Sequence, residues 1–91
     1  MNKTPRLDWQ RSQTLAVLKV TGDWTLEQRK PDLHEVWRQA GRLPEHMTVE
    51  VAVTAWDTSL LALLRRLQRL AAQQQVELSL QGLPDGVERL L

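Results

Sequence analysis

Two short segments alternate between apolar and polar residues, and this alternation limits the possible folds more than any other feature. The segments are residues 49–53 (VEVAV) and residues 76–81 (VELSLQ). Side chains of a strand point alternately to its two faces, so each segment predicts a strand with one apolar and one polar face. A sheet built from such strands leaves one face in water, and its helices must cover the other face.

Two further segments predict strands. Residues 14–20 (TLAVLKV) are richer in apolar and β-branched side chains, which is typical of a central strand. The turn-forming residues Gly22 and Asp23 are expected to end this strand. Residues 7–10 predict a short edge strand that pairs with it through a turn at residues 11–13. The sheet is therefore expected to have about four strands.

The first helical pattern covers residues 31–40. Its apolar side chains recur at helical spacing, Pro31 suits a first helical position, and Gly41 is expected to stop the helix. Acidic residues near its start complement the positive end of the helix. One amphipathic helix is therefore predicted between the central strand and the strand at residues 49–53.

Two more helices are predicted in the second half of the chain. Residues 60–71 carry leucines and an alanine at helical spacing over three turns, with Asp57 or Thr58 as the N-cap. The glutamines at positions 73–75 mark the end of this longest helix. Pro84 is expected to open a last helix that continues to the end of the sequence.

Strands and helices alternate along the chain, which predicts parallel strands joined by right-handed crossovers. We expect an α/β fold, with a small mixed or parallel sheet of about four strands and helices packed on one face. The 91 residues suit a single domain. The sequence closes on Leu90 and Leu91, which would expose apolar surface, so we expect an N-terminal fragment of a longer protein.

Composition excludes several classes of function. The chain has no cysteine, and His34 and His46 stand in no metal-ligand spacing. Twelve Lys and Arg against eleven Asp and Glu give a net charge of +1, too balanced for a nucleic-acid-binding protein. No apolar run approaches the about 20 residues of a membrane span. We therefore expect no catalysis, metal, cofactor, nucleic-acid partner or membrane insertion by this segment.

The junction between the strand at residues 49–53 and the longest helix carries the clearest candidate site. Asp57, Thr58 and Ser59 stand there, at the carboxyl end of a parallel strand, where binding sites concentrate. The same residue types are favoured helix N-caps, which is the simpler interpretation. Trp24 and Trp56 follow no helical period, and each either packs at the sheet edge or anchors a partner.

Three segments of the chain resemble a STAS domain. They are LKVTGDWT at 18–25, VEVAVTAWDTSLLALLRRLQRLA at 49–71 and VELSLQGLPDGVERLL at 76–91. The family pattern is a strand, an Asp, two small or hydroxyl residues, and a Gly-Leu pair that opens a helix. Asp57, Thr58 and Ser59 occupy the first three places, whereas Leu60 replaces the glycine and Leu61 keeps the leucine.

The amino-acid sequence of these segments is most similar to the N-terminal STAS segment of MlaE-type permeases in phospholipid-trafficking ABC transporters. The resemblance implies a non-catalytic regulatory domain at the cytoplasmic face of the bacterial inner membrane. Its partners would be the transporter's ATPase subunit and a permease in cis. Thr58 matches the hydroxyl that such domains use at the ATPase interface.

A second branch of the family gives an alternative function. Ser59 matches the phosphoacceptor position of anti-sigma factor antagonists, which are cytosolic switches controlled by a Ser/Thr kinase. Ser59 and Thr58 are therefore both candidate phosphoacceptors. The two functions differ in their partners, which are a transporter ATPase in one case and an anti-sigma kinase in the other.

We expect the partner surface to combine an aromatic anchor, hydroxyls and an unshielded leucine off the core stripe of the longest helix. Three arginines at positions 65, 66 and 69, with no acid between Asp57 and Glu77, favour an acidic partner surface. The predicted contact residues are Trp24, Trp56, Asp57, Thr58, Ser59, Leu60, Leu61 and Arg65.

Overall fold

The structure, a computed structural model, describes residues 4–12 and 14–91. Four strands form one sheet in the order β1-β2-β3-β4, in which β1 is antiparallel to β2 and the other pairs are parallel. The expected mixed α/β fold is confirmed. In chain order the elements are β1 (Arg6–Arg11), β2 (Ala16–Trp24), α1 (Leu33–Gln39), β3 (His46–Trp56), α2 (Thr58–Gln73), β4 (Glu77–Gln81) and α3 (Val87–Leu90).

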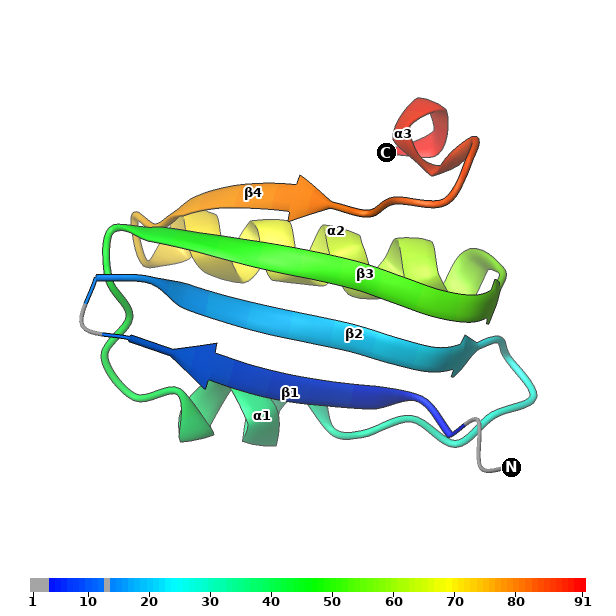
Figure 1. Cartoon of the computed structure of the whole chain (residues 1–91), viewed down its shortest axis with the longest axis horizontal. Helices are drawn as coiled ribbons and strands as arrows, with labels where there is room; N and C mark the ends of the chain where they lie inside the picture. The colour runs from blue at the N-terminus through cyan, green and yellow to red at the C-terminus, as the bar shows by residue number, and fades with distance from the viewer. Residues whose placement is uncertain (1–3, 13) are drawn as a thin grey trace.

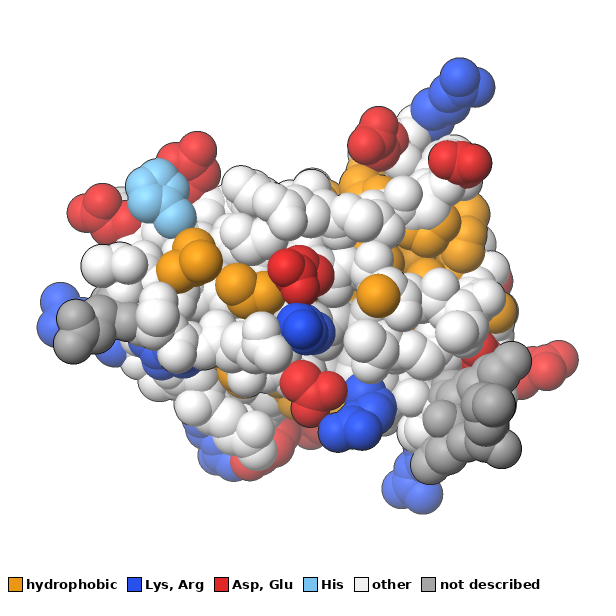
Figure 2. Space-filling model, in the orientation of Figure 1, with side chains coloured by type: hydrophobic (Ala, Val, Ile, Leu, Met, Phe, Trp, Pro, Cys, Tyr) orange, Lys and Arg blue, Asp and Glu red, His pale blue; other side chains and the backbone are white. Residues whose placement is uncertain are grey.

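The helices α1 and α2 lie on one side of the sheet, and α3 lies beyond the edge strand β4 (Figure 1). The opposite face of the sheet is polar. Asp8 is paired with Lys19 across β1 and β2, and Lys19 is paired with Glu50 across β2 and β3. Figure 2 shows acidic and basic side chains alternating over the middle of this face. The one-sided helix packing expected from the alternating strands is therefore confirmed for α1 and α2.

A single apolar core fills the space between the sheet and the helices. Alternate residues of β2 and β3 point into it, which satisfies the period-2 pattern of these strands. The helix α2 contributes a stripe of leucines at helical spacing. The fully buried large side chains are Leu18, Val20, Trp24, Met47, Val49, Leu60, Leu64, Leu67 and Val87.

The edge strand β1 is bound to α1 by its tryptophan and its last arginine. The indole nitrogen of Trp9 donates a 2.8 Å hydrogen bond to the carbonyl of Val36. The ring centroids of Trp9 and Trp37 lie 6.1 Å apart. The guanidinium of Arg11 donates to the carbonyl of Ala40, and to that of Arg42 at 2.6 Å. These contacts satisfy carbonyls at the end of α1 that have no partner within the helix.

The strand β2 is longer than the sequence predicts. Gly22 and Asp23 were expected to end it, but β2 continues through both residues to Trp24. The pairing with β3 shifts register at this point, because Gly22 pairs with Val53 whereas Asp23 pairs with Ala55. Such a bulge keeps two strands paired while bending them. It brings the ends of β2 and β3 to the same edge as the start of α2.

Two helices begin later than predicted. Pro31 precedes α1 rather than opening it, because the Asp32 side chain accepts a hydrogen bond from the amide of His34 and caps the helix. Pro84 starts a turn, closed by a 3.2 Å hydrogen bond from the amide of Val87 to its carbonyl, and α3 begins only at Val87. The predicted end of α2 in the glutamine run is confirmed at Gln73.

Candidate functional site

The candidate site lies where β2 and β3 end and α2 begins. Asp57 is the N-cap of α2, with its backbone extended and one carboxylate oxygen accepting a 2.9 Å hydrogen bond from the amide of Ser59. Of the two predicted caps, the structure therefore selects Asp57. The amide of Asp57 donates to the carbonyl of Trp24 at 3.1 Å, which fixes the start of the helix to the end of β2.

The second carboxylate oxygen of Asp57 reaches a different part of the chain. It accepts a 2.7 Å hydrogen bond from the amide of Leu26, in the segment between β2 and α1. Hydrogen bonds from the amides of Leu26 and Ser59, with a smaller effect of nearby Lys30, lower the pKa of the Asp57 carboxyl. The group is therefore a charged acceptor that joins two segments and is poorly suited to take up a proton.

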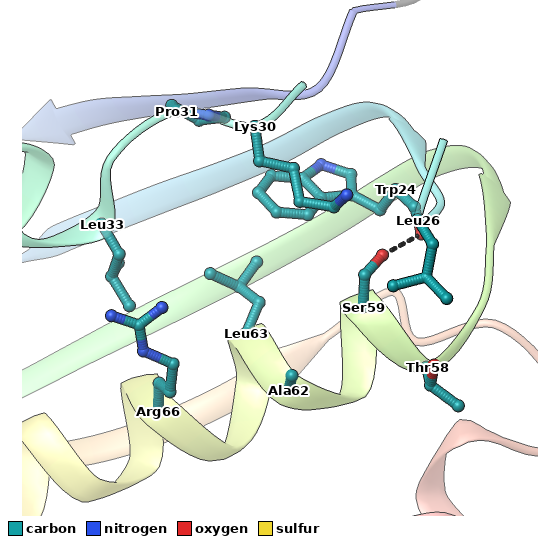
Figure 3. A pocket seen from close by; sticks show the side chains of 10 residues that line it. All are labelled: Trp24, Leu26, Lys30, Pro31, Leu33, Thr58, Ser59, Ala62, Leu63 and Arg66. Carbon is teal, nitrogen blue, oxygen red and sulfur yellow. Dashed lines mark hydrogen bonds between the residues drawn. The ribbon is translucent and has the colours of Figure 1, made fainter. Parts of the chain in front are cut away.

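The hydroxyl of Ser59 faces inward. Its oxygen lies 2.9 Å from the carbonyl oxygen of Trp24 (Figure 3). It also lies 2.8 Å from a carboxylate oxygen of Asp57. A serine hydroxyl has one proton to donate, so these two acceptors share it. Ser59 is half-buried, and its side chain serves the junction between β2 and α2.

The hydroxyl of Thr58 faces outward. Thr58 is exposed, and its side chain forms no hydrogen bond with any residue that the structure describes. Of the two hydroxyls predicted as phosphoacceptors, Thr58 is thus the accessible one and Ser59 is the bonded one. The sequence pattern alone did not distinguish them.

The side chains of three predicted contact residues are buried in this structure. Trp24 is 2% exposed and donates its indole N–H to the carbonyl of Thr21 at 2.8 Å, so it packs in the core. Leu60 is 0% exposed and Leu61 only 8% exposed, so the expected unshielded leucine is absent. Trp56 is half-buried and packs against the core.

The C-terminal residues contact α2 close to Leu61. Arg65, one helical turn after Leu61, donates a 2.7 Å hydrogen bond to the carbonyl of Leu90. Residues four apart lie on the same side of a helix, so Leu61 also faces the C-terminal segment. Leu61 and Val87 belong to the same core cluster. Arg65 is exposed, but part of its hydrogen-bonding capacity is used within the chain.

A cleft of about 440 Å³ lies beside the first turns of α2 (Figure 3). Its wall is mainly apolar and includes Leu26, whose side chain is 72% exposed. No sequence pattern predicts this part of the site, because residues 25–31 have no periodic spacing of apolar side chains. The residues that line the cleft are Trp24, Leu26, Lys30, Pro31, Leu33, Thr58, Ser59, Ala62, Leu63 and Arg66.

In residues 4–12 and 14–91, no group of three or more His, Cys, Asp or Glu side chains could hold a metal ion. In the same residues, no helix is long and apolar enough to span a membrane. His34, on α1, is exposed as its position off the apolar stripe predicts.

In comparisons with known proteins, no family model matches the chain and no curated protein matches it. The STAS resemblance thus stays a prediction that rests on the quoted segments. The site itself is defined by its geometry, as a helix start fixed by Asp57, an exposed hydroxyl on Thr58, and an adjacent apolar cleft.

Proposed function

We propose that this chain is a non-catalytic regulatory domain that docks on another protein through the start of α2. The partner, following the STAS resemblance, is the ATPase subunit of a phospholipid-trafficking ABC transporter. The observation that carries the proposal is the position of Thr58, whose exposed hydroxyl has no partner among the described residues. A hydroxyl in this position is available to hydrogen-bond a backbone group of a facing protein.

The rigidity of the junction supports docking at this place. Asp57 binds the amides of both Leu26 and Ser59, and Ser59 in turn binds the carbonyl of Trp24. A surface held in one geometry before binding loses less conformational entropy when a partner arrives. Thr58 is therefore presented from a preorganised turn.

The surroundings of Thr58 supply the remaining properties of an interface. Trp56 is half-buried, and Leu26 is largely exposed. Aromatic and apolar side chains of this kind form the energetic centre of many interfaces. The exposed arginines at positions 65, 66 and 69 of α2 favour an acidic partner surface, so the complex should weaken with added salt.

In this proposal the domain acts at the cytoplasmic face of the bacterial inner membrane, with a permease in cis. Its role is to assemble or regulate the transporter, and it takes no part in nucleotide hydrolysis. The low pKa of Asp57 agrees with a structural role for this acid.

One observation favours the alternative, an anti-sigma factor antagonist controlled by phosphorylation. The exposed hydroxyl of Thr58 lies at the N-terminus of a 16-residue helix, where backbone amides and the helix dipole stabilise a phosphate. The test is incubation with ATP and an anti-sigma kinase. Stoichiometric phosphate on Thr58 would favour this alternative.

Co-purification tests the main proposal. The natural gene product is co-expressed with the ATPase subunit of a lipid ABC transporter from the same genome, as wild type, Thr58→Glu or Thr14→Glu. Thr14 is also exposed but lies between β1 and β2, at the opposite end of the sheet (Figure 1). We expect Thr58→Glu to reduce ATPase recovery at least tenfold and Thr14→Glu to leave it unchanged. Equal recovery in all three would remove this surface from the interface.

A further inference from the structure

The cleft beside α2 has an apolar wall built from two parts of the chain. Leu26 comes from the segment between β2 and α1, Leu33 is the first residue of α1, and Leu63 comes from α2. The indole of Trp24 closes the inner side (Figure 3). A volume of about 440 Å³ lies within the range of small-molecule sites, which is about 300–1,000 Å³.

Positive charge lies at the border of this apolar space. Arg66 lines the cleft and also a second hollow, whose lining includes His34 and Arg69. The guanidinium of Arg66 forms no hydrogen bond or ion pair with any residue in the described ranges. Lys30 also lines the cleft, and its ammonium donates to the carbonyls of Thr25 at 2.5 Å and Gln28 at 2.8 Å, which leaves one N–H unused.

Acidic side chains are missing from the same border. Among the described residues, no Asp or Glu lines the cleft or the second hollow. The nearest acid along α2 is Asp57, and both of its carboxylate oxygens are already bound to amides. An apolar space with the unpaired guanidinium of Arg66 at its border is complementary to a molecule with an apolar body and an anionic end.

We propose that this cleft binds a small single-chain amphiphile with an anionic head. The tail lies against Leu26, Leu33 and Leu63, and the head pairs with Arg66. This site goes beyond the docking function and does not depend on it. A protein segment is the less suitable occupant, because a specific protein interface needs about 1,000 Å² and one cleft of this size supplies only part of that.

Titration with sodium octanoate, below its micelle-forming concentration, tests the proposal by amide NMR spectra of the isolated chain. We expect saturable shifts confined to the start of α2 and to residues 24–33. Hexanoate should bind about 16-fold weaker than octanoate, and decanoate about 16-fold tighter. Each differs from octanoate by two methylenes, and each buried methylene contributes about 0.8 kcal/mol, or about fourfold in affinity. Acetate tests the anion alone and should cause no saturable shift, whereas octan-1-ol tests the tail alone and should bind two- to fivefold weaker than octanoate.

Two variants test separately how the tail and the head of the amphiphile contribute to binding. Ala62 is exposed on α2 and lines the cleft, so Ala62→Trp should fill it without disturbing the core and weaken octanoate at least tenfold. Ala72 is exposed on the same helix but lines neither hollow, and Ala72→Trp is the matched control. Arg66→Gln should weaken octanoate about two- to fivefold and leave octan-1-ol unchanged, since an exposed ion pair contributes up to about 1 kcal/mol.

The proposal is overturned by an absence of saturable octanoate shifts, by equal binding of octanoate and octan-1-ol, or by equal effects of the two tryptophan variants. A third result would also overturn the proposal: the wild-type chain does not bind octanoate, and Ala62→Trp loses ATPase recovery. In that case the cleft accepts a side chain of the protein partner. Octanoate binding with unchanged recovery in Thr58→Glu would support this site while contradicting the docking function. The failures of the two proposals are therefore distinguishable.

Discussion

The carboxylate of Asp57 accepts a 2.7 Å hydrogen bond from the amide of Leu26, a residue 31 positions earlier in the chain. The same carboxylate caps α2 through the amide of Ser59. One side chain therefore fixes both the start of the helix and the segment that forms one wall of the cleft. The position of Leu26, and with it the shape of the candidate site, depends on Asp57.

Replacement of Asp57 by alanine should lower the melting temperature of the isolated chain by about 4–8 °C, which is the usual effect of losing one N-cap in a domain of this size. The amides of Leu26 and Ser59 lose their acceptor in this variant. Thermal unfolding followed by circular dichroism measures the change. Thr58→Ala is the control and should melt within about 2 °C of wild type, since the Thr58 side chain has no partner among the described residues. Equal melting of Asp57→Ala and wild type would contradict the role of the cap.

The contribution of Asp57 to stability should depend on pH. Its pKa is lowered in the folded protein by hydrogen bonds from Leu26 and Ser59, so the folded state favours the charged form. The contribution is therefore full above the unfolded pKa of about 4 and is lost as the pH falls through the lower, folded pKa. Urea unfolding of wild type and Asp57→Asn from pH 7 to pH 2.5 should show a difference in unfolding free energy that shrinks below pH 4. A difference that is constant or grows toward low pH would be inconsistent with this linkage.

Gly82 should be far less tolerant of substitution than Gly41, although both have positive φ. A Cβ atom at Gly82 would lie 2.4 Å from the carbonyl oxygen of Val51, whereas a Cβ at Gly41 would meet no atom within 4 Å. Gly41→Ala should cost about 1–2 kcal/mol from the left-handed backbone alone. Gly82→Ala should cost clearly more, because the backbone of β3 must also move. Chemical denaturation of both variants checks the order, and the reverse order would show that the chain after β4 does not pass this close to β3.

An acid at position 58 should be tolerated, whereas an acid at position 59 should not. The first turn of α2 contains no acidic residue, so Thr58→Glu adds a favourable interaction with the helix dipole and should keep both helix content and melting temperature. The Ser59 oxygen lies 2.8 Å from the Asp57 carboxylate, so Ser59→Asp brings two like charges together and should lower the melting temperature. Circular dichroism of the two variants measures this. Similar melting of both would contradict the inward position of Ser59.

The sequence predicts the fold well where a local pattern decides the structure. The alternation in residues 49–53 and the leucine spacing in residues 60–71 report burial directly, and both elements form with the expected faces. The continuation of β2 through Gly22 to Trp24 is not visible locally, because it depends on pairing with β3 across a bulge. A long-range pairing of this kind overrides the turn preference of glycine and aspartate.

The candidate site is only partly predictable for the same reason. Residue type and position narrow the N-cap to Asp57 or Thr58, and the structure shows that it is Asp57. The burial of Trp24 and Leu61 arises from packing in a core whose members come from segments far apart in the sequence. The contact between Asp57 and Leu26 joins two segments with no shared pattern, so no local signal indicates the cleft.

Amide hydrogen exchange of the natural gene product, with and without the ATPase subunit, tests the central claim most directly. The docking surface predicts slower exchange in the first turns of α2, at residues 58–63, and in residues 24–30. The polar face of the sheet, which includes Lys19 and Glu50, should exchange at the same rate in both samples. Protection confined to that sheet face, or no protection in a sample that contains the complex, would contradict docking through the start of α2.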